Sequence, residues 1–169
     1  DLTVGFDGYT EDGVVITADT MTGDVDINDG AATLNAAATT GDIAIDDENT
    51  TNDNTTAVVV NAANASDIDI GQTRAFEGSV TVNAAAADTV EVATSGAQTI
   101  NAATANDVDV DDATGGATIT AGVSNTDDTV ITLVNVDATG ATITTGTGVA
   151  ASATGKQIDI DIDGTALAT

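Results

Sequence analysis

The chain has 169 residues and a formal net charge of -26, with 28 acidic residues against two basic ones, Arg74 and Lys156. It contains no His, Cys, Pro or Trp, and its aromatic residues are Phe6, Tyr9 and Phe76. Phosphate recognition needs Lys and Arg, so this composition argues against nucleic acid and anionic membrane surfaces as partners, and no apolar run is long enough for membrane insertion. Because the usual acid–base and nucleophilic side chains are reduced to carboxylates, hydroxyls and one Lys, we do not expect an enzyme.

The N-terminal segment, residues 1–12, reads DLTVGFDGYTED and shows little of the repetition that follows it. We expect it to form a cap on the repeats or a segment that docks on a neighbouring subunit. Residues 13–146 are expected to form the repeat region. Residues 147–169 are expected to be a connector rich in Gly, Ala and Ser, followed by a C-terminal strand within KQIDIDIDG.

Two short elements alternate along the repeat region. The first is acidic, with a β-branched residue at every second position: GDVDIND, GDIAIDD, SDIDIGQ, DTVEVAT and NDVDVDD begin at residues 23, 41, 66, 88 and 106. The second sets Thr or Asn around an aliphatic residue: ATLNAAA, VVVNAAN, VTVNAAA, QTINAAT, ATITAGV and ATITTGT begin at residues 32, 58, 80, 98, 117 and 141. Alternation of Val, Ile and Thr with polar residues, bounded by Gly, Asn and Asp, predicts β-strands.

The spacing of the acidic elements predicts the architecture. Their anchor residues Val25, Ile43, Ile68, Val90 and Val108 lie 18 to 25 residues apart. This spacing predicts an all-β, parallel β-solenoid (β-helix) with rungs of about 18–25 residues, each stacking on the last. An antiparallel sandwich would need two-residue hairpin turns and bulky core residues, and a helix over Ala-rich bridges such as NAATAND would be too short to persist. Disorder is the remaining alternative, and the regular placement of the apolar residues argues against it.

Stacking the acidic elements in register lines up carboxylates on one outer face. Two carboxylates about 4.8 Å apart repel by about 3.5 kcal/mol at an effective dielectric constant of about 20. One remedy is Ca²⁺, which prefers oxygen ligands and would bridge carboxylates on neighbouring rungs. The predicted metal ligands are Asp24, Asp26, Asp42, Asp46, Asp67, Asp69, Glu91, Asp107, Asp109, Asp111 and Asp112. The other interpretation, which stays open, is a solvated face in a salt-rich medium that screens the charges.

The Thr/Asn elements predict a second outer face. Thr33 and Asn35 flank Leu34, and Thr99 and Asn101 flank Ile100 in the same way; Thr118, Thr120, Thr142 and Thr144 continue these columns. We interpret the columns as strand-favouring threonines beside asparagines that hydrogen-bond a turn or stack as a ladder. The alternative is an ice-binding solenoid that presents a flat Thr/Asn ladder.

The repeats TINAATANDVDVDDATGGATITAG and VTVNAAAADTVEVATSGAQTINAA resemble the Thr/Ala/Asn/Asp-rich β-solenoid regions of bacterial surface-layer (S-layer) proteins and of RTX-type (repeat-in-toxin) calcium-binding adhesins. The resemblance covers residues 13–146 and lies in their composition and repeat pattern. It implies secretion, calcium-dependent folding and a role in a surface lattice or fibre. The toxin-type core GGxGxD is absent, since DDATGGATIT has the glycine pair without the following Gly and Asp, so calcium ligands are not transferred position by position.

These observations predict an extracellular or cell-surface structural protein. The open end rungs of a solenoid invite another strand, so we expect copies of the chain to assemble head-to-tail into a filament or surface layer, with Ca²⁺ as the stabilising ion. The alternatives are the ice-binding solenoid and a non-catalytic adhesin domain with a cell-surface glycan as partner. The sequence shows no signal-peptide pattern, so an exported chain is expected to be the processed form.

Overall fold

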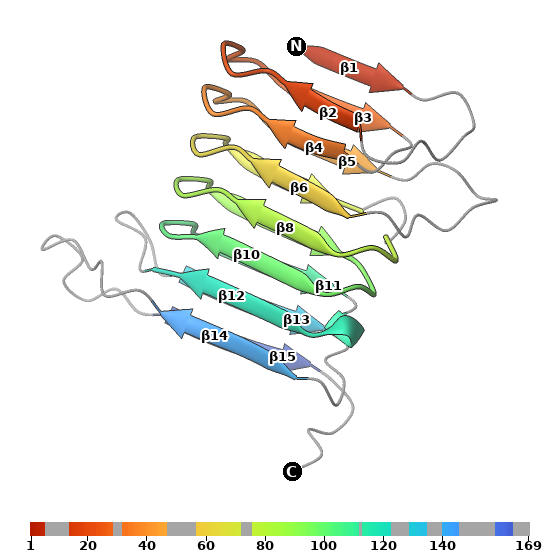
Figure 1. Ribbon diagram of the computed structural model, residues 1–169. Coiled ribbons are helices and arrows are strands. Elements are labelled where there is room, and N and C mark those ends of the chain that lie inside the picture. The colour runs from red at the N-terminus through yellow and green to blue at the C-terminus, as the bar shows by residue number, and fades with distance from the viewer. Residues whose placement is uncertain are drawn as a thin grey trace, which may run out of the picture.

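The computed structural model describes residues 1–5, 14–28, 32–46, 57–71, 76–111, 113–122, 129–134, 140–145 and 158–163. Its strands form two parallel sheets (Figure 1). Sheet A contains, in spatial order, β1 (Leu2–Gly5), β3 (Val25–Asn28), β5 (Ile43–Asp46), β7 (Asp67–Ile70), β9 (Thr89–Ala93), β11 (Asp107–Asp111), β13 (Thr129–Val134) and β15 (Ile158–Asp163). Sheet B contains β2 (Val14–Thr17), β4 (Ala32–Asn35), β6 (Val58–Asn61), β8 (Val80–Asn83), β10 (Gln98–Ala102), β12 (Ala117–Ala121) and β14 (Ala141–Thr145).

The chain alternates between the sheets, so each rung of the coil contributes one strand to each sheet. The strands of sheet B run in the opposite direction to those of sheet A behind them (Figure 1). The register places the anchors Val25, Ile43, Ile68, Val90 and Val108 beside one another on successive rungs. The predicted all-β parallel solenoid is therefore confirmed.

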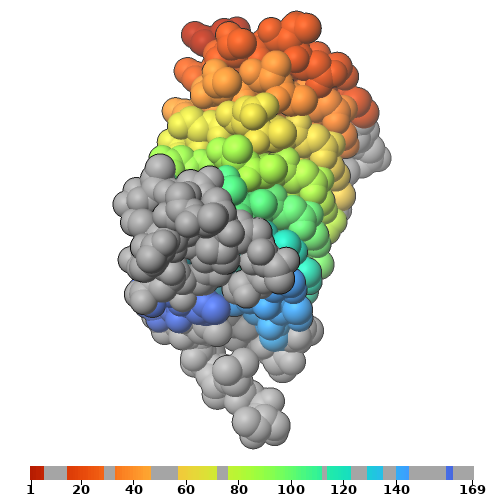
Figure 2. Space-filling model, turned by 90° about the vertical axis from the view of Figure 1, so that its left-hand side faces the viewer, coloured from red at the N-terminus to blue at the C-terminus, as the bar shows by residue number. Residues whose placement is uncertain are grey.

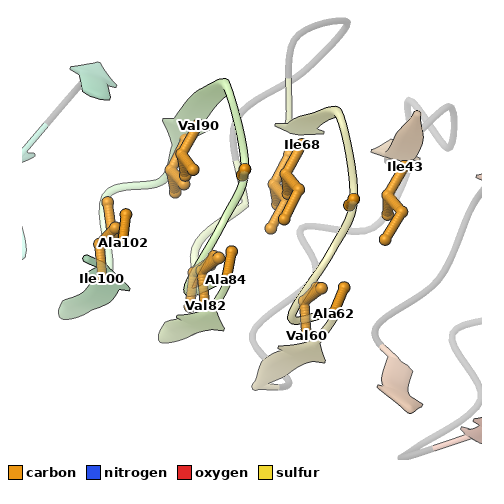
Figure 3. Packing of buried hydrophobic residues seen from close by; sticks show 14 of the residues in the cluster. Ile43, Val60, Ala62, Ile68, Val82, Ala84, Val90, Ile100 and Ala102 are labelled. Atoms are coloured by element: carbon orange, nitrogen blue, oxygen red, sulfur yellow. The ribbon is translucent and has the colours of Figure 1, made fainter. Parts of the chain in front are cut away.

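The core is a thin layer between the two sheets. In Figure 3 the inner residues of sheet A (Ile43, Ile68 and Val90) face those of sheet B (Val60 with Ala62, Val82 with Ala84, and Ile100 with Ala102), and each kind stacks along the coil. All of these side chains are buried. Since full burial of a Val or Ile side chain contributes about 1.5–3 kcal/mol, a column of small β-branched residues stabilises the coil without aromatic bulk.

The Ala-rich bridges form tight turns at the corner between sheet B and sheet A. The Thr39 N–H donates to the Ala36 carbonyl at 3.0 Å, and the Met21 N–H donates to the Ala18 carbonyl at 3.0 Å. The inner position of this corner is filled by buried alanines on successive rungs, Ala65, Ala87 and Ala105. The bridges are turns and not helices, as expected from their length. Figure 2 shows this side of the coil, with successive rungs stacked from one end to the other.

The opposite corner depends on stacked glycines. A Cβ on Gly96 would lie 2.3 Å from the Gly78 carbonyl oxygen, and a Cβ on Gly115 would lie 2.4 Å from the Gly96 carbonyl carbon. Between these rungs the buried Thr94 hydroxyl donates toward the Phe76 and Gly78 carbonyl oxygens, both at 2.7 Å. One 3₁₀ turn, η1 (Ala113–Gly115), lies at this corner.

Strand pairing extends beyond the predicted repeat region of residues 13–146. β1 pairs with β3, and β15 pairs with β13, in the same parallel arrangement as the other strands of sheet A. The first and last segments of the chain therefore each contribute a strand to the solenoid. The remainder of the predicted N-terminal cap, residues 6–12, lies outside the described residues.

Candidate functional site

The outer surface of sheet A is acidic. Most of the predicted metal ligands lie on its strands and point away from the core: Asp26, Asp46, Asp67, Asp69, Glu91, Asp107, Asp109 and Asp111. Asp24 and Asp42 are exposed at the corner just before β3 and β5, and Asp112 lies outside the described residues. Asp159 and Asp161 on β15 lie in the same two columns, one rung beyond Val130 and Thr132, and were not among the predicted ligands.

The strand register brings some of these carboxylates onto adjacent rungs and separates others. Asp69, Glu91 and Asp109 occupy equivalent positions on β7, β9 and β11. In the neighbouring column, Thr89 lies between Asp67 and Asp107. The predicted columns are thus formed, and their longest uninterrupted carboxylate run in the described strands is Asp69–Glu91–Asp109.

The crowding of these carboxylates alters their acidity. Partial burial, followed by the charges of Asp67, Asp42 and Asp46, raises the pKa of Asp69. Burial and then the charges of Asp69, Asp109, Asp107 and Asp111 raise the pKa of Glu91. For Asp107, burial and the Asp109 charge raise the pKa, against a backbone hydrogen bond from Val108 that lowers it. The folded coil therefore disfavours full ionisation of this face.

The acidic face has some of the features that a calcium site requires and lacks others. One carboxylate oxygen of Asp107 and one of Asp109 are buried and accept no hydrogen bond. Carboxylate oxygens are the ligands that Ca²⁺ prefers. Calcium, however, takes six to eight oxygen ligands, and in the described ranges no three acidic side chains come together in a group that could hold a metal ion. The carboxylate ligands are thus of the right kind for calcium, but the described residues do not provide enough of them around one point to form a complete site.

Asp24 and its neighbours have a structural role that the sequence pattern did not indicate. The Asp42 N–H donates to Asp24 Oδ1 at 3.1 Å, and the Asp24 N–H donates to Asp1 Oδ1 at 3.3 Å. The carboxylate of one rung thus binds the backbone of the next. A Cβ on Gly41 would lie 2.2 Å from Asp24 Oδ1, so the GD pairs at residues 23 and 41 have a packing reason. That pairing of Gly with Asp was the available sequence signal.

The outer surface of sheet B carries an asparagine ladder. The Nδ2 groups of Asn61, Asn83 and Asn101 donate to the side-chain oxygens of Asn35, Asn61 and Asn83 at 2.9, 2.8 and 2.8 Å. The interpretation of these asparagines as a stacked ladder is therefore confirmed. Beside them runs a second column, Val15, Thr33, Val59, Thr81, Thr99, Thr118 and Thr142.

The two outer faces differ in charge. On the described strands of sheet B, every outward position is Thr, Asn or Val, and Thr17, Thr120 and Thr144 extend the asparagine column. Sheet A carries the acidic columns on the opposite side of the coil, as the two layers in Figure 1 show. The chain thus presents one strongly anionic face and one uncharged face.

Comparison with protein-family models, with curated proteins and with solved structures found no match. None of the described elements is a helix with the length and apolar character needed to cross a membrane.

Proposed function

We propose that this chain is a structural subunit of an extracellular filament or surface layer, in which copies stack head-to-tail through the ends of the solenoid. The observation that supports this is the exposure of core-type residues at both ends. Ile131 is 0 % exposed, whereas Ile160, its partner one rung further, is 47 % exposed. At the other end, Leu2, Val4 and Ile16 are only partly buried against the core.

The two ends are compatible in register. A parallel strand added to β15 would bring Leu2 and Val4 of a second copy over the apolar positions of that strand. Because sheet A has eight strands and sheet B seven, one strand position would stay open between β14 and β2 of the second copy. Ile16 and Ile143 occupy the same inner column of sheet B. Pairing of this kind would satisfy the backbone groups of both edge strands, and repetition along the coil axis gives an open filament.

Cations have a secondary role in this proposal. Acidic residues face outward on β3, β5, β7, β9, β11 and β15 of sheet A, and a filament would repeat this face, so mobile counter-ions would reduce the repulsion between rungs. Calcium would act here as a loosely held ion between pairs of carboxylates, with water completing its shell. Together with the acidity of the chain, the resemblance of the repeats to S-layer and RTX-type regions supports an extracellular location.

The contact between ends is tested by two variants of matched chemistry. Ile160→Lys places a charge in the exposed end of the core, and Val130→Lys replaces an apolar residue that is 37 % exposed on the outer face of sheet A. Sedimentation velocity over a range of protein concentrations should show large assemblies for the native chain and for Val130→Lys, and loss of them for Ile160→Lys. Equal assembly by all three proteins would reject the end-to-end contact.

A further inference from the structure

The uncharged face of sheet B is unexpected in a chain with a formal net charge of -26. Its outward residues are Val15, Thr17, Thr33, Asn35, Val59, Asn61, Thr81, Asn83, Thr99, Asn101, Thr118, Thr120, Thr142 and Thr144. Val15 is 64 % exposed, and Asn101, Thr118 and Thr142 are exposed as well. Solubility alone would favour carboxylates on both faces of the coil.

Charge decides which sides of two copies can meet. A contact between two A sheets would bring the acidic columns of both copies together, where like charges repel, and a contact of sheet A with sheet B would remove the carboxylates of one copy from water without a cation to pair them. Contact through sheet B brings together only hydroxyl, amide and methyl groups and leaves the carboxylates of both copies in water. The uncharged face of one copy is therefore suited to pack against the same uncharged face of a second copy.

The shape of the face suits such a partner. The side chains stand in straight columns with a spacing of about 4.8 Å between rungs, so two copies share the same period and can pack in register, as paired sheets do. Seven strands of four or five residues give a face of about 500 Å², or about 1,000 Å² for two copies, which reaches the lower limit for a specific interface.

The polar groups of the face are already partly satisfied within each chain. In the asparagine ladder each amide from Asn61 to Asn101 donates to the asparagine one rung earlier. Covering the ladder with a partner sheet therefore leaves fewer unpaired donors than isolated asparagines would. The methyl groups of the threonines and of Val15 and Val59 supply apolar area.

We propose that two copies of this chain associate laterally, face to face, through the outer surfaces of their B sheets. The contact is additional to the end-to-end contact proposed above and does not depend on it. Its expected form is an isologous pair in which β8, the central strand of sheet B, lies over β8 of the partner.

The test uses an Ile160→Lys background, in which the end-to-end contact is blocked, so that the two contacts are judged separately. Thr81→Glu on β8 adds a carboxylate to the uncharged face, and Thr89→Glu on β9 adds one to the acidic face; both threonines are half-buried. Circular dichroism establishes that both variants keep their strand content. The background protein and Thr89→Glu should sediment as dimers, and Thr81→Glu as a monomer. A background protein that stays monomeric, or dimers that survive Thr81→Glu, would overturn the proposal.

Spin labels give the geometry, and the absence of native Cys makes labelling specific. Face-to-face sheets pack about 10 Å apart. Labels at Thr81→Cys in the two copies should therefore indicate backbones about 10 Å apart. Labels at Thr89→Cys, one sheet further out in each copy, should indicate backbones about 30 Å apart. End-to-end stacking would instead give about 35–40 Å for both labels. Equal distances for the two labels would contradict lateral pairing.

A native monomer that inhibits ice recrystallisation, with loss of inhibition in Thr81→Glu, would assign the face to ice and overturn the proposal.

Discussion

Asn83 donates a hydrogen bond from Nδ2 to the side-chain oxygen of Asn61 at 2.8 Å and accepts one from Asn101 at 2.8 Å. Each interior asparagine of the ladder is thus bonded to the rung before it and the rung after it. The ladder fixes the register of adjacent rungs, because a shift of one residue would place an asparagine opposite an aliphatic residue.

The ladder predicts a stability difference between an interior and a terminal asparagine. Asn83→Ala removes two side-chain hydrogen bonds and should lower the free energy of unfolding by about 1–3 kcal/mol. Asn101→Ala removes the single ladder bond that Asn101 donates and should cost about half as much. Urea unfolding followed by circular dichroism measures both, and equal losses would show that the ladder bonds do not stabilise the coil.

The glycine corner predicts a steric effect. In Gly96→Ala the new methyl group would meet the Gly78 carbonyl oxygen at 2.3 Å, so the rungs would have to separate, at a cost of about 1–3 kcal/mol. Gly5→Ala is the control, since nothing lies within 4 Å of the position of its added Cβ. A lower midpoint of urea unfolding is expected for Gly96→Ala alone. Similar midpoints for the two variants would contradict the close stacking of this corner.

The acidic face predicts an unusual dependence of stability on pH. The pKa values of Asp69, Glu91 and Asp107 are raised in the folded chain above their ordinary values of 3.8, 4.5 and 3.8. A group whose folded pKa is raised takes up a proton on folding, so these three groups destabilise the fold above the folded pKa. Their penalty is relieved as the pH falls through the folded pKa toward the ordinary value. The urea midpoint should therefore rise on acidification from pH 7 toward about pH 4.5.

A charge-removal variant checks the origin of that dependence. The triple variant Asp69→Asn, Glu91→Gln and Asp107→Asn should be more stable than the native chain at pH 7 and should show a flatter pH profile. A native midpoint that falls steadily on acidification, or a triple variant with an unchanged profile, would contradict the assignment to these carboxylates.

The same face predicts how salts act. Added NaCl should raise the thermal midpoint, because the screening length shortens toward about 3 Å at 1 M. Calcium should add a gradual increase that does not saturate at a fixed number of ions per chain, because the described carboxylates form no group of three. Isothermal titration calorimetry separates the cases, and tight stoichiometric binding of calcium would show that a built site exists.

The fold could be predicted from the sequence because the acidic elements recur at the spacing of one rung. Val25, Ile43 and Ile68 lie at the same place in successive acidic elements, and inner and outer positions alternate strictly, so the register followed from the spacing. The stacked asparagines followed for the same reason.

The candidate site was less predictable. Alignment in a column does not by itself gather carboxylates around one ion, and among the described residues no three acidic side chains form such a group. The backbone bond to Asp24 depends on the closeness of Gly23 and Gly41, which spacing alone did not indicate. The strand β1 was missed because the short segment Leu2–Gly5 lacks the acidic pattern of the later rungs.

Negative-stain electron microscopy of the purified chain, at fixed ionic strength and with either millimolar calcium or a chelator, tests the proposed structural role most directly. Head-to-tail stacking predicts filaments or sheets in both conditions, with calcium changing their abundance and not their existence. Discrete single particles in both conditions, at concentrations where the chain is folded, would contradict a self-assembling structural subunit.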